Sequence, residues 1–121
     1  MKTIYSTRID KVGEKATDFL EAGMFITFKD DAPQELKDYC FVHQENNLVE
    51  DIKENDILCI DNENYIVEFV GEAVNKNLND LGHITFNFQG ETETRAAGTL
   101  YLEKKEIVPM AVGTILKIIR K

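Results

Sequence analysis

The sequence predicts an all-β fold, a mainly antiparallel barrel or sandwich with one or two short helices. Its apolar segments are short and mostly end in Asn, Asp, Gly or charged pairs, a spacing typical of strands and turns rather than of a helical bundle. Apolar and polar residues also alternate, as they do in a strand with one buried face. With 121 residues the chain has the size of one domain, and residues 1–121 are expected to form a single unit.

Eight segments have the length and composition of strands. They lie near Thr3 to Ile9, Met24 to Phe28, Tyr39 to His43, Ile57 to Ile60, Tyr65 to Val70, His83 to Phe88, Gly98 to Glu103 and Thr114 to Ile119. In the sixth segment Ile84, Phe86 and Phe88 would share one face and His83 would lie on the other. The charged segment 91–95 is expected to join two strands of a hairpin.

Two short helices are expected between the strands. Pro33 can open the first, from Pro33 to Lys37, because the first helical turn does not need the N–H that proline lacks. The second would run from Glu72 to Leu81. Gly82 would end it, since glycine readily adopts the left-handed conformation of a helix C-terminus. This junction places His83 at the beginning of a strand.

The charge of the chain excludes several classes of partner. There are 22 acidic and 14 basic residues, a formal net charge of −8. Nucleic acid is therefore a poor partner, and so is an anionic membrane surface, because both attract basic proteins. No apolar run approaches the roughly 20 residues of a spanning helix. The N-terminus has no secretory signal, so we expect a cytoplasmic protein without direct membrane insertion.

The two cysteines, Cys40 and Cys59, both lie in apolar stretches. In a reducing compartment each is most simply a small buried hydrophobic residue. A disulfide between them is the alternative.

The chain has two histidines, His43 and His83, each at the border of an apolar strand and a polar stretch. At such a border a reactive side chain can be both held and reached. A histidine there can also be a partly buried, hydrogen-bonded residue without a chemical role. Imidazole suits a phosphocarrier, because it offers a neutral nitrogen lone pair and its phosphoramidate remains a good phosphoryl donor.

Cys40 is the rival nucleophile, because it precedes His43 by three residues and a Cys–His pair would indicate thiol chemistry. On a regular strand, however, this spacing puts the two side chains on opposite faces. Tyr39, Phe41 and His43 would share one face, and Cys40 would pack with Val42. The predicted strand thus disfavours the dyad, although a bulge or an early strand end would allow it.

Metal and cofactor sites have no clear sequence signal. The two histidines are far apart and the chain has no C-x-x-C or H-E-x-x-H motif, so no metal is expected. No glycine-rich phosphate loop is present, and no nucleotide or other cofactor is expected. A phosphoryl group would therefore have to come from another protein.

The segment Asp38-Tyr39-Cys40-Phe41-Val42-His43 resembles the glucitol/sorbitol IIA family of the bacterial phosphoenolpyruvate-dependent sugar phosphotransferase system. Further blocks similar to the family follow in order along almost the whole chain. They are Ile26-Thr27-Phe28 with Ala32-Pro33, Val70-Gly71, Asn77-Leu78 with Leu81-Gly82-His83, Phe88 to Gly90, Gly98-Thr99, and Gly113-Thr114 with Leu116-Lys117.

The resemblance implies a relay of phosphoryl groups. Phospho-HPr would donate to His43, which would donate to the cysteine of the cognate IIB domain, and the membrane IIC component would couple transfer to sugar uptake. The resemblance also implies a site role for His83 as a phosphoryl stabiliser beside His43. Some family members carry another histidine where this chain has Glu45, and a proline where it has Val112.

Transfer between two proteins calls for in-line geometry, and a recessed histidine could not meet its partner. We therefore expect His43 near the surface, in an apolar collar that includes Phe41, Val42 or neighbouring aromatic residues. If His83 adjoins His43 it can donate a hydrogen bond to the phosphoryl group, and otherwise it is structural. The alternative function is a non-catalytic small β domain that binds a ligand or regulatory partner.

Overall fold

The structure is a computed structural model that describes residues 1–90 and 95–121. Its elements are β1 (Lys2–Val12), the 3-10 helix η1 (Ala16–Ala22), β2 (Met24–Lys29), α1 (Gln34–Lys37), β3 (Phe41–His43), β4 (Asn47–Leu48), β5 (Ile57–Ile60), β6 (Glu63–Val70), α2 (Val74–Leu81), β7 (Ile84–Asn87), β8 (Thr99–Leu102) and β9 (Ile115–Arg120). All eight predicted strands are present, and the prediction of an all-β fold with short helices is confirmed.

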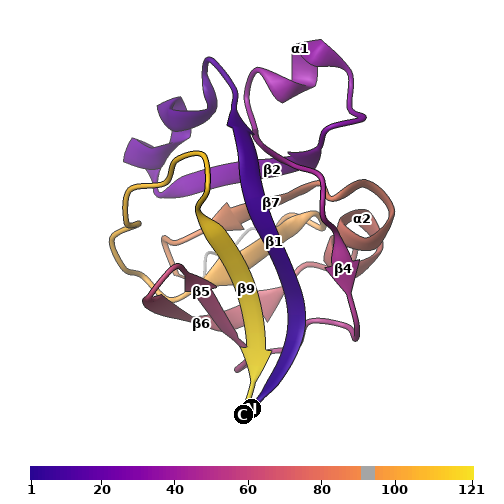
Figure 1. Ribbon diagram of the computed structural model, residues 1–121. Coiled ribbons are helices and arrows are strands. Elements are labelled where there is room, and N and C mark those ends of the chain that lie inside the picture. Colours follow the sequence, from indigo (N-terminus) through magenta and orange to yellow (C-terminus); the bar gives the residue numbers. More distant parts are fainter. Residues whose placement is uncertain (91–94) are drawn as a thin grey trace.

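The strands of the described residues form one nine-stranded sheet that closes on itself (Figure 1). Its order is β3-β2-β7-β8-β6-β5-β9-β1-β4, and an additional pairing of β3 with β1 closes it into a barrel. The β2–β3 and β7–β8 neighbours are parallel, whereas the other pairs are antiparallel. Closure leaves β3 between two strands rather than at an open edge.

Strand β1 forms the corner at which the barrel closes. It pairs with β9 from Lys2 to Arg8 and then with β3 from Ile9 to Val12, and its register shifts between Thr3 and Tyr5 and again between Ile9 and Lys11. Such an irregularity bends a strand and lets it serve two neighbours. The end of β3 is thereby held against β1, and the two chain termini meet at the other end of β1 (Figure 1).

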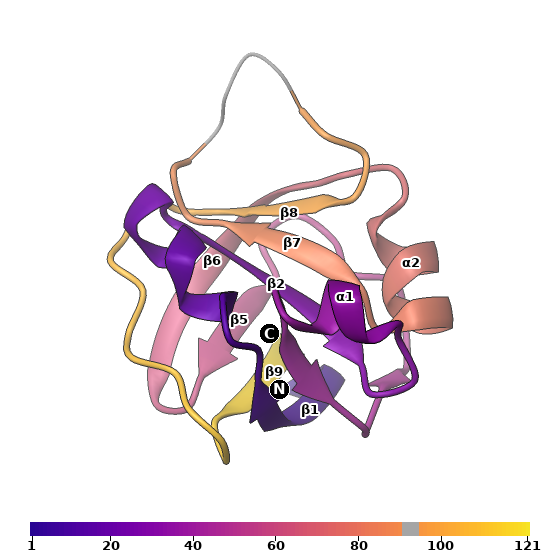
Figure 2. The same cartoon turned by 90° about the horizontal axis from the view of Figure 1, so that it is seen from above.

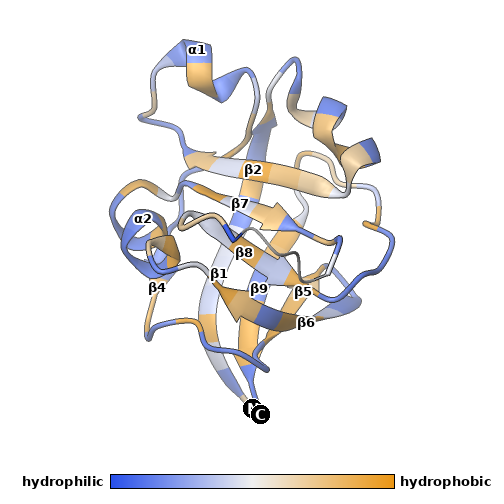
Figure 3. Ribbon diagram, turned by 180° about the vertical axis from the view of Figure 1, so that it is seen from behind, coloured by the Kyte–Doolittle hydropathy of each residue, from blue (hydrophilic) through white to orange (hydrophobic). Residues whose placement is uncertain are grey.

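Aromatic side chains fill the barrel interior on the side of β2 and β7. The ring of Phe25 stacks on Phe86 at 4.5 Å and meets the edge of Phe41 at 5.6 Å. In Figure 3 the apolar stretches lie mainly on the strands, whereas many of the connecting loops are polar. The side chains with no exposed surface include Ile4, Ile9, Phe25, Phe41, Leu58, Ile60, Tyr65, Val67, Val74, Leu78, Leu100, Leu102, Leu116 and Ile118.

Both predicted helices are present, and Figures 1 and 2 place α1 and α2 on the same side of the barrel. Helix α1 follows Pro33 as expected. Helix α2 ends at Gly82, which has φ +63° and donates its N–H to the Leu78 carbonyl at 2.9 Å. The predicted glycine stop is confirmed, and it leads directly into β7.

Three local features differ from the predictions. The elements η1 and β4 were not predicted, because one is a 3-10 turn and the other has two residues. The expected hairpin involves residues 91–94, which lie outside the described residues. The flanking strands β7 and β8 pair in parallel, so the hairpin prediction was wrong.

In the described ranges, no helix has the length and apolarity needed to cross a membrane.

Candidate functional site

His43 is the last residue of β3, at the point where the barrel closes. It is paired with Ile9 of β1 on one side and with Lys29 of β2 on the other. Its side chain has 0% exposure, so the prediction that it lies near the surface was wrong. Phe41 and Val42 are also buried and form no exposed collar. Barrel closure explains the error, because it encloses β3 from both sides.

The imidazole ring of His43 lies between two backbone carbonyl groups. Its Nδ1 is 2.8 Å from the oxygen of Glu45, and its Nε2 is 2.9 Å from the oxygen of Gly82. Each carbonyl also accepts a hydrogen bond from a buried threonine. Thr7 Oγ1 donates to the Glu45 oxygen, and Thr27 Oγ1 donates to the Gly82 oxygen at 3.1 Å. Both carbonyls thus keep a donor when the imidazole does not donate to them.

The two contacts restrict the protonation states that this geometry can satisfy. A neutral imidazole has one N–H and can donate to only one carbonyl, whereas the imidazolium ion donates to both. In the neutral ring, one nitrogen lone pair would therefore point at a carbonyl oxygen. That contact is repulsive, and it favours withdrawal of the unprotonated nitrogen from its carbonyl.

Gly82 covers the Nε2 edge of the His43 ring. A β-carbon on this glycine would lie 2.6 Å from Cε1 and 2.8 Å from Nε2 of His43, and 2.7 Å from Cγ of Lys29. The positive φ of +63° also disfavours a side chain. Glycine is therefore needed at position 82 both for its conformation and for its close approach to the ring.

The loop that carries the Glu45 carbonyl is tied to β1 and α2. Tyr5 donates its hydroxyl to Oδ1 of Asn46 at 2.8 Å, and Nδ2 of Asn46 donates to the Leu78 carbonyl at 2.7 Å. Burial raises the pKa of the Tyr5 hydroxyl well above its usual range, which keeps it a hydrogen-bond donor. The Nδ1 side of His43 is therefore anchored by several elements.

His83 is half-buried and lies beside β2. Its Nδ1 is 3.0 Å from the Thr27 carbonyl oxygen, and its ring stacks on Phe28 with centroids 4.1 Å apart. Adjacent strand residues such as Thr27 and Phe28 point to opposite faces. Nε2 of His43 contacts the Gly82 carbonyl, to which the Thr27 side chain donates. The His83 ring, in contrast, stacks on the Phe28 side chain. Within residues 1–90 and 95–121 no hydrogen bond joins the two imidazole rings.

Cys40 belongs to a small apolar cluster that His43 does not enter. It packs with Phe28, Ala32 and Val42, and its thiol donates to the Leu36 carbonyl at 3.2 Å. Burial raises the pKa of this thiol to about 11, so little thiolate is available at neutral pH. The predicted packing with Val42 is confirmed. Tyr39 was wrongly placed on the His43 face, because it precedes β3 and is 41% exposed.

Both cysteines are free, so the disulfide alternative was wrong. The prediction of a buried hydrophobic residue is confirmed for Cys40, whereas Cys59 on β5 is only half-buried. Burial raises the pKa of the Cys59 thiol as well.

Charged residues surround the end of β2 next to His43. Asp30 accepts hydrogen bonds from Lys37 at 3.2 Å and from Lys11 at 3.4 Å, and its backbone N–H donates to the His43 carbonyl. These partners, chiefly Lys37, lower the pKa of the Asp30 carboxyl. Lys29 is paired more loosely, with Nζ 3.9 Å from Oδ2 of Asp31.

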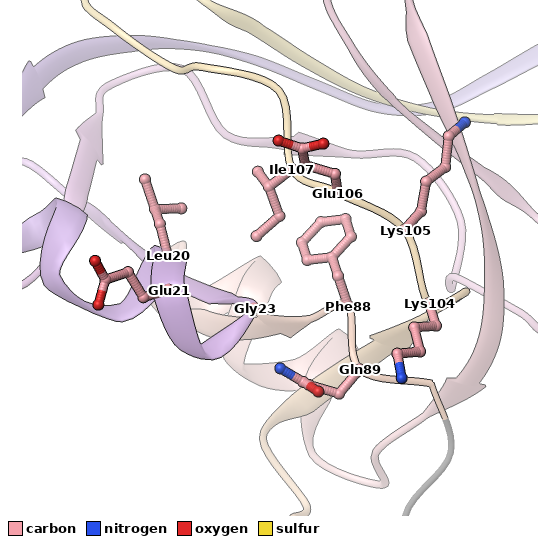
Figure 4. A pocket seen from close by; sticks show the side chains of 9 residues that line it. All are labelled: Leu20, Glu21, Gly23, Phe88, Gln89, Lys104, Lys105, Glu106 and Ile107. Atoms are coloured by element: carbon pink, nitrogen blue, oxygen red, sulfur yellow. The ribbon is translucent and has the colours of Figure 1, made fainter.

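A separate pocket of about 510 Å³ lies between η1, the end of β7 and the loop after β8 (Figure 4). Its lining is Leu20, Glu21, Gly23, Phe88, Gln89, Lys104, Lys105, Glu106 and Ile107. Neither histidine contributes to it. The chemistry that the chain can perform with His43 is therefore not located in this pocket.

Several residues around His43 were not singled out from the sequence. Thr27 and Gly82 do belong to the blocks Ile26-Thr27-Phe28 and Leu81-Gly82-His83, which resemble the family. The resemblance did not indicate what either residue does. Thr7 and Lys29 gave none, because an isolated threonine or lysine in a strand is common. Their positions depend on the pairing of β3 with β1 and β2.

Comparison with known proteins gives a consistent result over nearly the whole chain. The family model of the glucitol/sorbitol-specific IIA component of the phosphotransferase system matches residues 4–117. The chain is 35% identical to the glucitol/sorbitol-specific EIIA component of Shigella flexneri and 34% identical to that of Escherichia coli strain K12. Each match covers 97% of this chain and 95% of the relative.

A solved structure has the same fold. It is the crystal structure of a phosphotransferase system IIA component from Enterococcus faecalis V583, with a TM-score of 0.86 and 22% sequence identity. The similarity covers 95% of this chain and 99% of that one.

Proposed function

Because the chain belongs to the glucitol/sorbitol-specific IIA family of the sugar phosphotransferase system, we propose that it is a cytoplasmic histidine phosphocarrier. In this proposal His43 accepts a phosphoryl group from phospho-HPr and passes it to the cognate IIB domain, for sugar uptake and phosphorylation through the membrane IIC component. The observation that carries the proposal is the pair of carbonyls facing both nitrogens of His43, each backed by a buried threonine.

We assign the attack to Nε2 of His43. The Nδ1–H donates to the Glu45 carbonyl, whose loop is anchored to β1 and α2 through Asn46. This bond leaves the lone pair on Nε2, where it meets the Gly82 oxygen unfavourably. Withdrawal of Nε2 from Gly82 relieves that contact. The carbonyl stays hydrogen-bonded, because Thr27 continues to donate to it.

The transfer is a displacement at phosphorus. The Nε2 lone pair of His43 forms a bond to the phosphorus of phospho-HPr, and the donor N–P bond breaks with its electron pair returning to the donor imidazole. In the second step the thiolate of the IIB cysteine attacks the same phosphorus, and the pair of the N–P bond returns to His43. Positioning and charge stabilisation account for most of the catalysis in such reactions.

The burial of His43 requires that its cover moves before transfer. Gly82 stands against the Nε2 edge next to the stem of Lys29, and it lies between α2 and β7. His83 holds this segment to β2 through Thr27 and Phe28. We therefore propose that His83 supports phosphoryl transfer mainly by positioning Gly82, rather than by direct contact with the His43 ring.

Phospho-HPr would approach on the side of the barrel that carries α1 and α2. The two helices lie on one side in Figures 1 and 2, and Gly82 directly follows α2. Each carries an exposed apolar side chain, Leu36 with 48% and Leu81 with 44% exposure. Apolar contacts of this kind exclude water when a transient complex forms.

Incubation with phosphoenolpyruvate, enzyme I and HPr tests the proposed function. The wild-type chain should gain the mass of one phosphoryl group in an acid-labile form. His43→Gln should gain none, whereas Cys40→Ser should gain it as the wild type does. His43→Gln is preferred to His43→Ala because it keeps volume and a donor in a fully buried position.

Two outcomes would contradict this reading. Acceptance by His43→Gln together with loss in Cys40→Ser would move the nucleophile to Cys40. Absence of any mass gain with active upstream proteins would favour the non-catalytic binding domain instead.

A further inference from the structure

We propose that Lys29 supplies the positive charge that stabilises the phosphoryl group on His43. The inference rests on the proposed function and names a further residue of the same site. Lys29 of β2 is directly paired with His43 in the parallel β2–β3 register. Residues paired in this way project to the same face of a sheet. The two side chains therefore leave neighbouring strands in the same direction.

The stem of Lys29 and the Nε2 edge of the imidazole ring both lie close to Gly82. The β-carbon position above Gly82 lies 2.7 Å from Lys29 Cγ, 2.6 Å from His43 Cε1 and 2.8 Å from His43 Nε2. The Lys29 stem and the ring edge thus both stand next to Gly82. A phosphoryl group on Nε2 has to occupy space on this side, so Lys29 is among the first side chains that it meets.

The ammonium group of Lys29 can be redirected with little loss of stability. Its Nζ lies 3.9 Å from the Asp31 carboxylate, and the two side chains are 29% and 74% exposed. Ion pairs of this length and exposure contribute little. Lys37 differs, because it donates to both the Asp30 carboxylate at 3.2 Å and the Asp30 carbonyl at 3.0 Å. Lys37 is therefore held by Asp30, whereas Lys29 is free of such strong bonds to a neighbouring residue and can turn toward the ring.

A phosphoryl group at this place needs a cation. The chain carries a formal net charge of −8, and a phosphoryl group adds about 1.5–2 negative charges. Asp30 and Asp31 directly follow β2, so the new charge would lie near carboxylates. The Asp30 charge is already met by Lys11 and Lys37. If the Lys29 ammonium leaves Asp31 and donates to the phosphoryl oxygens, it forms a charge-assisted hydrogen bond that is stronger than its present ion pair at 3.9 Å.

The test compares variants that differ in charge at the same place. Lys29→Met keeps the stem that packs on Gly82 but removes the charge, Lys29→Gln is a second neutral variant, and Lys29→Arg restores the charge. Lys11→Met is the matched control, because it removes one positive charge from a 63% exposed side chain paired with Asp30 at 3.4 Å. Far-UV circular dichroism establishes that each variant is folded.

The first readout is the rate of transfer from phospho-HPr, measured by rapid quench. Both neutral Lys29 variants should be slower than wild type by about 10-fold or more, because loss of a donor to developing charge slows transfer, though less at a partly exposed site than in an enclosed one. Lys29→Arg should recover most of the rate, and Lys11→Met should stay close to wild type.

The second readout is the pH titration of the phosphohistidine, followed by ³¹P NMR. A nearby ammonium favours the fully ionised phosphoryl group, so its midpoint pH should rise by about 1 in Lys29→Met. A role in packing alone would not move this midpoint. Wild-type acceptance with Lys29→Met equal to Lys11→Met in both readouts would overturn the inference alone. Absence of acceptance by the wild type would overturn the proposed function as well.

Discussion

Replacement of Gly82 by alanine should destabilise the fold and disturb His43. The new β-carbon would lie 2.6 Å from His43 Cε1 and 2.7 Å from Lys29 Cγ, well inside normal contact distance. The left-handed backbone adds about 1–2 kcal/mol for a residue with a side chain. Forced repacking adds about 1–3 kcal/mol. The sum of about 2–5 kcal/mol is a large part of the roughly 5–15 kcal/mol that stabilises a typical domain.

Urea denaturation followed by far-UV circular dichroism measures this loss, and Gly113→Ala is the matched control. Gly113 has φ +97°, but a β-carbon there would meet no atom within 4 Å, so that variant reports backbone strain without the steric clash. Its φ lies farther from the left-handed minimum than that of Gly82, so the control carries at least as much backbone strain as Gly82→Ala. A loss in Gly82→Ala no larger than the backbone strain alone, about 1–2 kcal/mol, would refute the close approach of Gly82 to the imidazole.

Three further perturbations test other parts of the molecule. His83→Ala should slow phosphoryl transfer to the IIB domain while leaving acceptance by His43 possible, because it loosens the Gly82 segment; a wild-type transfer rate in the folded variant would reduce His83 to a structural residue. Cys40 should react with iodoacetamide slowly at pH 8 and faster only as the pH approaches its thiol pKa of about 11, because burial disfavours the thiolate; equal rates in native and urea-unfolded protein at pH 8, read by mass spectrometry, would contradict this. Arg120→Met should lower the urea midpoint, because it removes the guanidinium that pairs with the 2% exposed Asp56 carboxylate, whose Oδ1 lies 2.8 Å from Nε of Arg120. Lys76→Met, which breaks an exposed pair, should leave the midpoint nearly unchanged, and equal midpoints for these two variants would count against a stabilising role of Arg120.

The short apolar segments and their turn residues were sufficient to predict the strands and the two helices. These signals are local: alternation within a strand, proline before α1, and the glycine that ends α2. Order and direction of the strands are not local. The parallel pairing of β7 with β8 could not be deduced from the segment between them. The prediction of a hairpin was wrong for this reason.

In the candidate site, too, the sequence predicted local features but not those that depend on strand pairing. His43 was singled out by its place after Phe41-Val42 and by the resemblance, but its burial depends on β3 being enclosed by β1 and β2. The close approach of Gly82 to the ring and to the Lys29 stem likewise connects residues that are far apart in the sequence. A strand-end position in the sequence says nothing about closure of a barrel. The expectation of a surface histidine was wrong for this reason.

Mapping of the phosphoryl group on the phosphorylated wild-type chain tests the central claim most directly. Trypsin separates the two histidines, since His43 falls on peptide 38–53 and His83 on peptide 77–95. Digestion at neutral pH preserves the acid-labile bond, and tandem mass spectrometry then locates the added mass. We predict one phosphoryl group on peptide 38–53, with fragment ions that place it on His43. A phosphoryl group on peptide 77–95, or on Cys40 within peptide 38–53, would contradict the account.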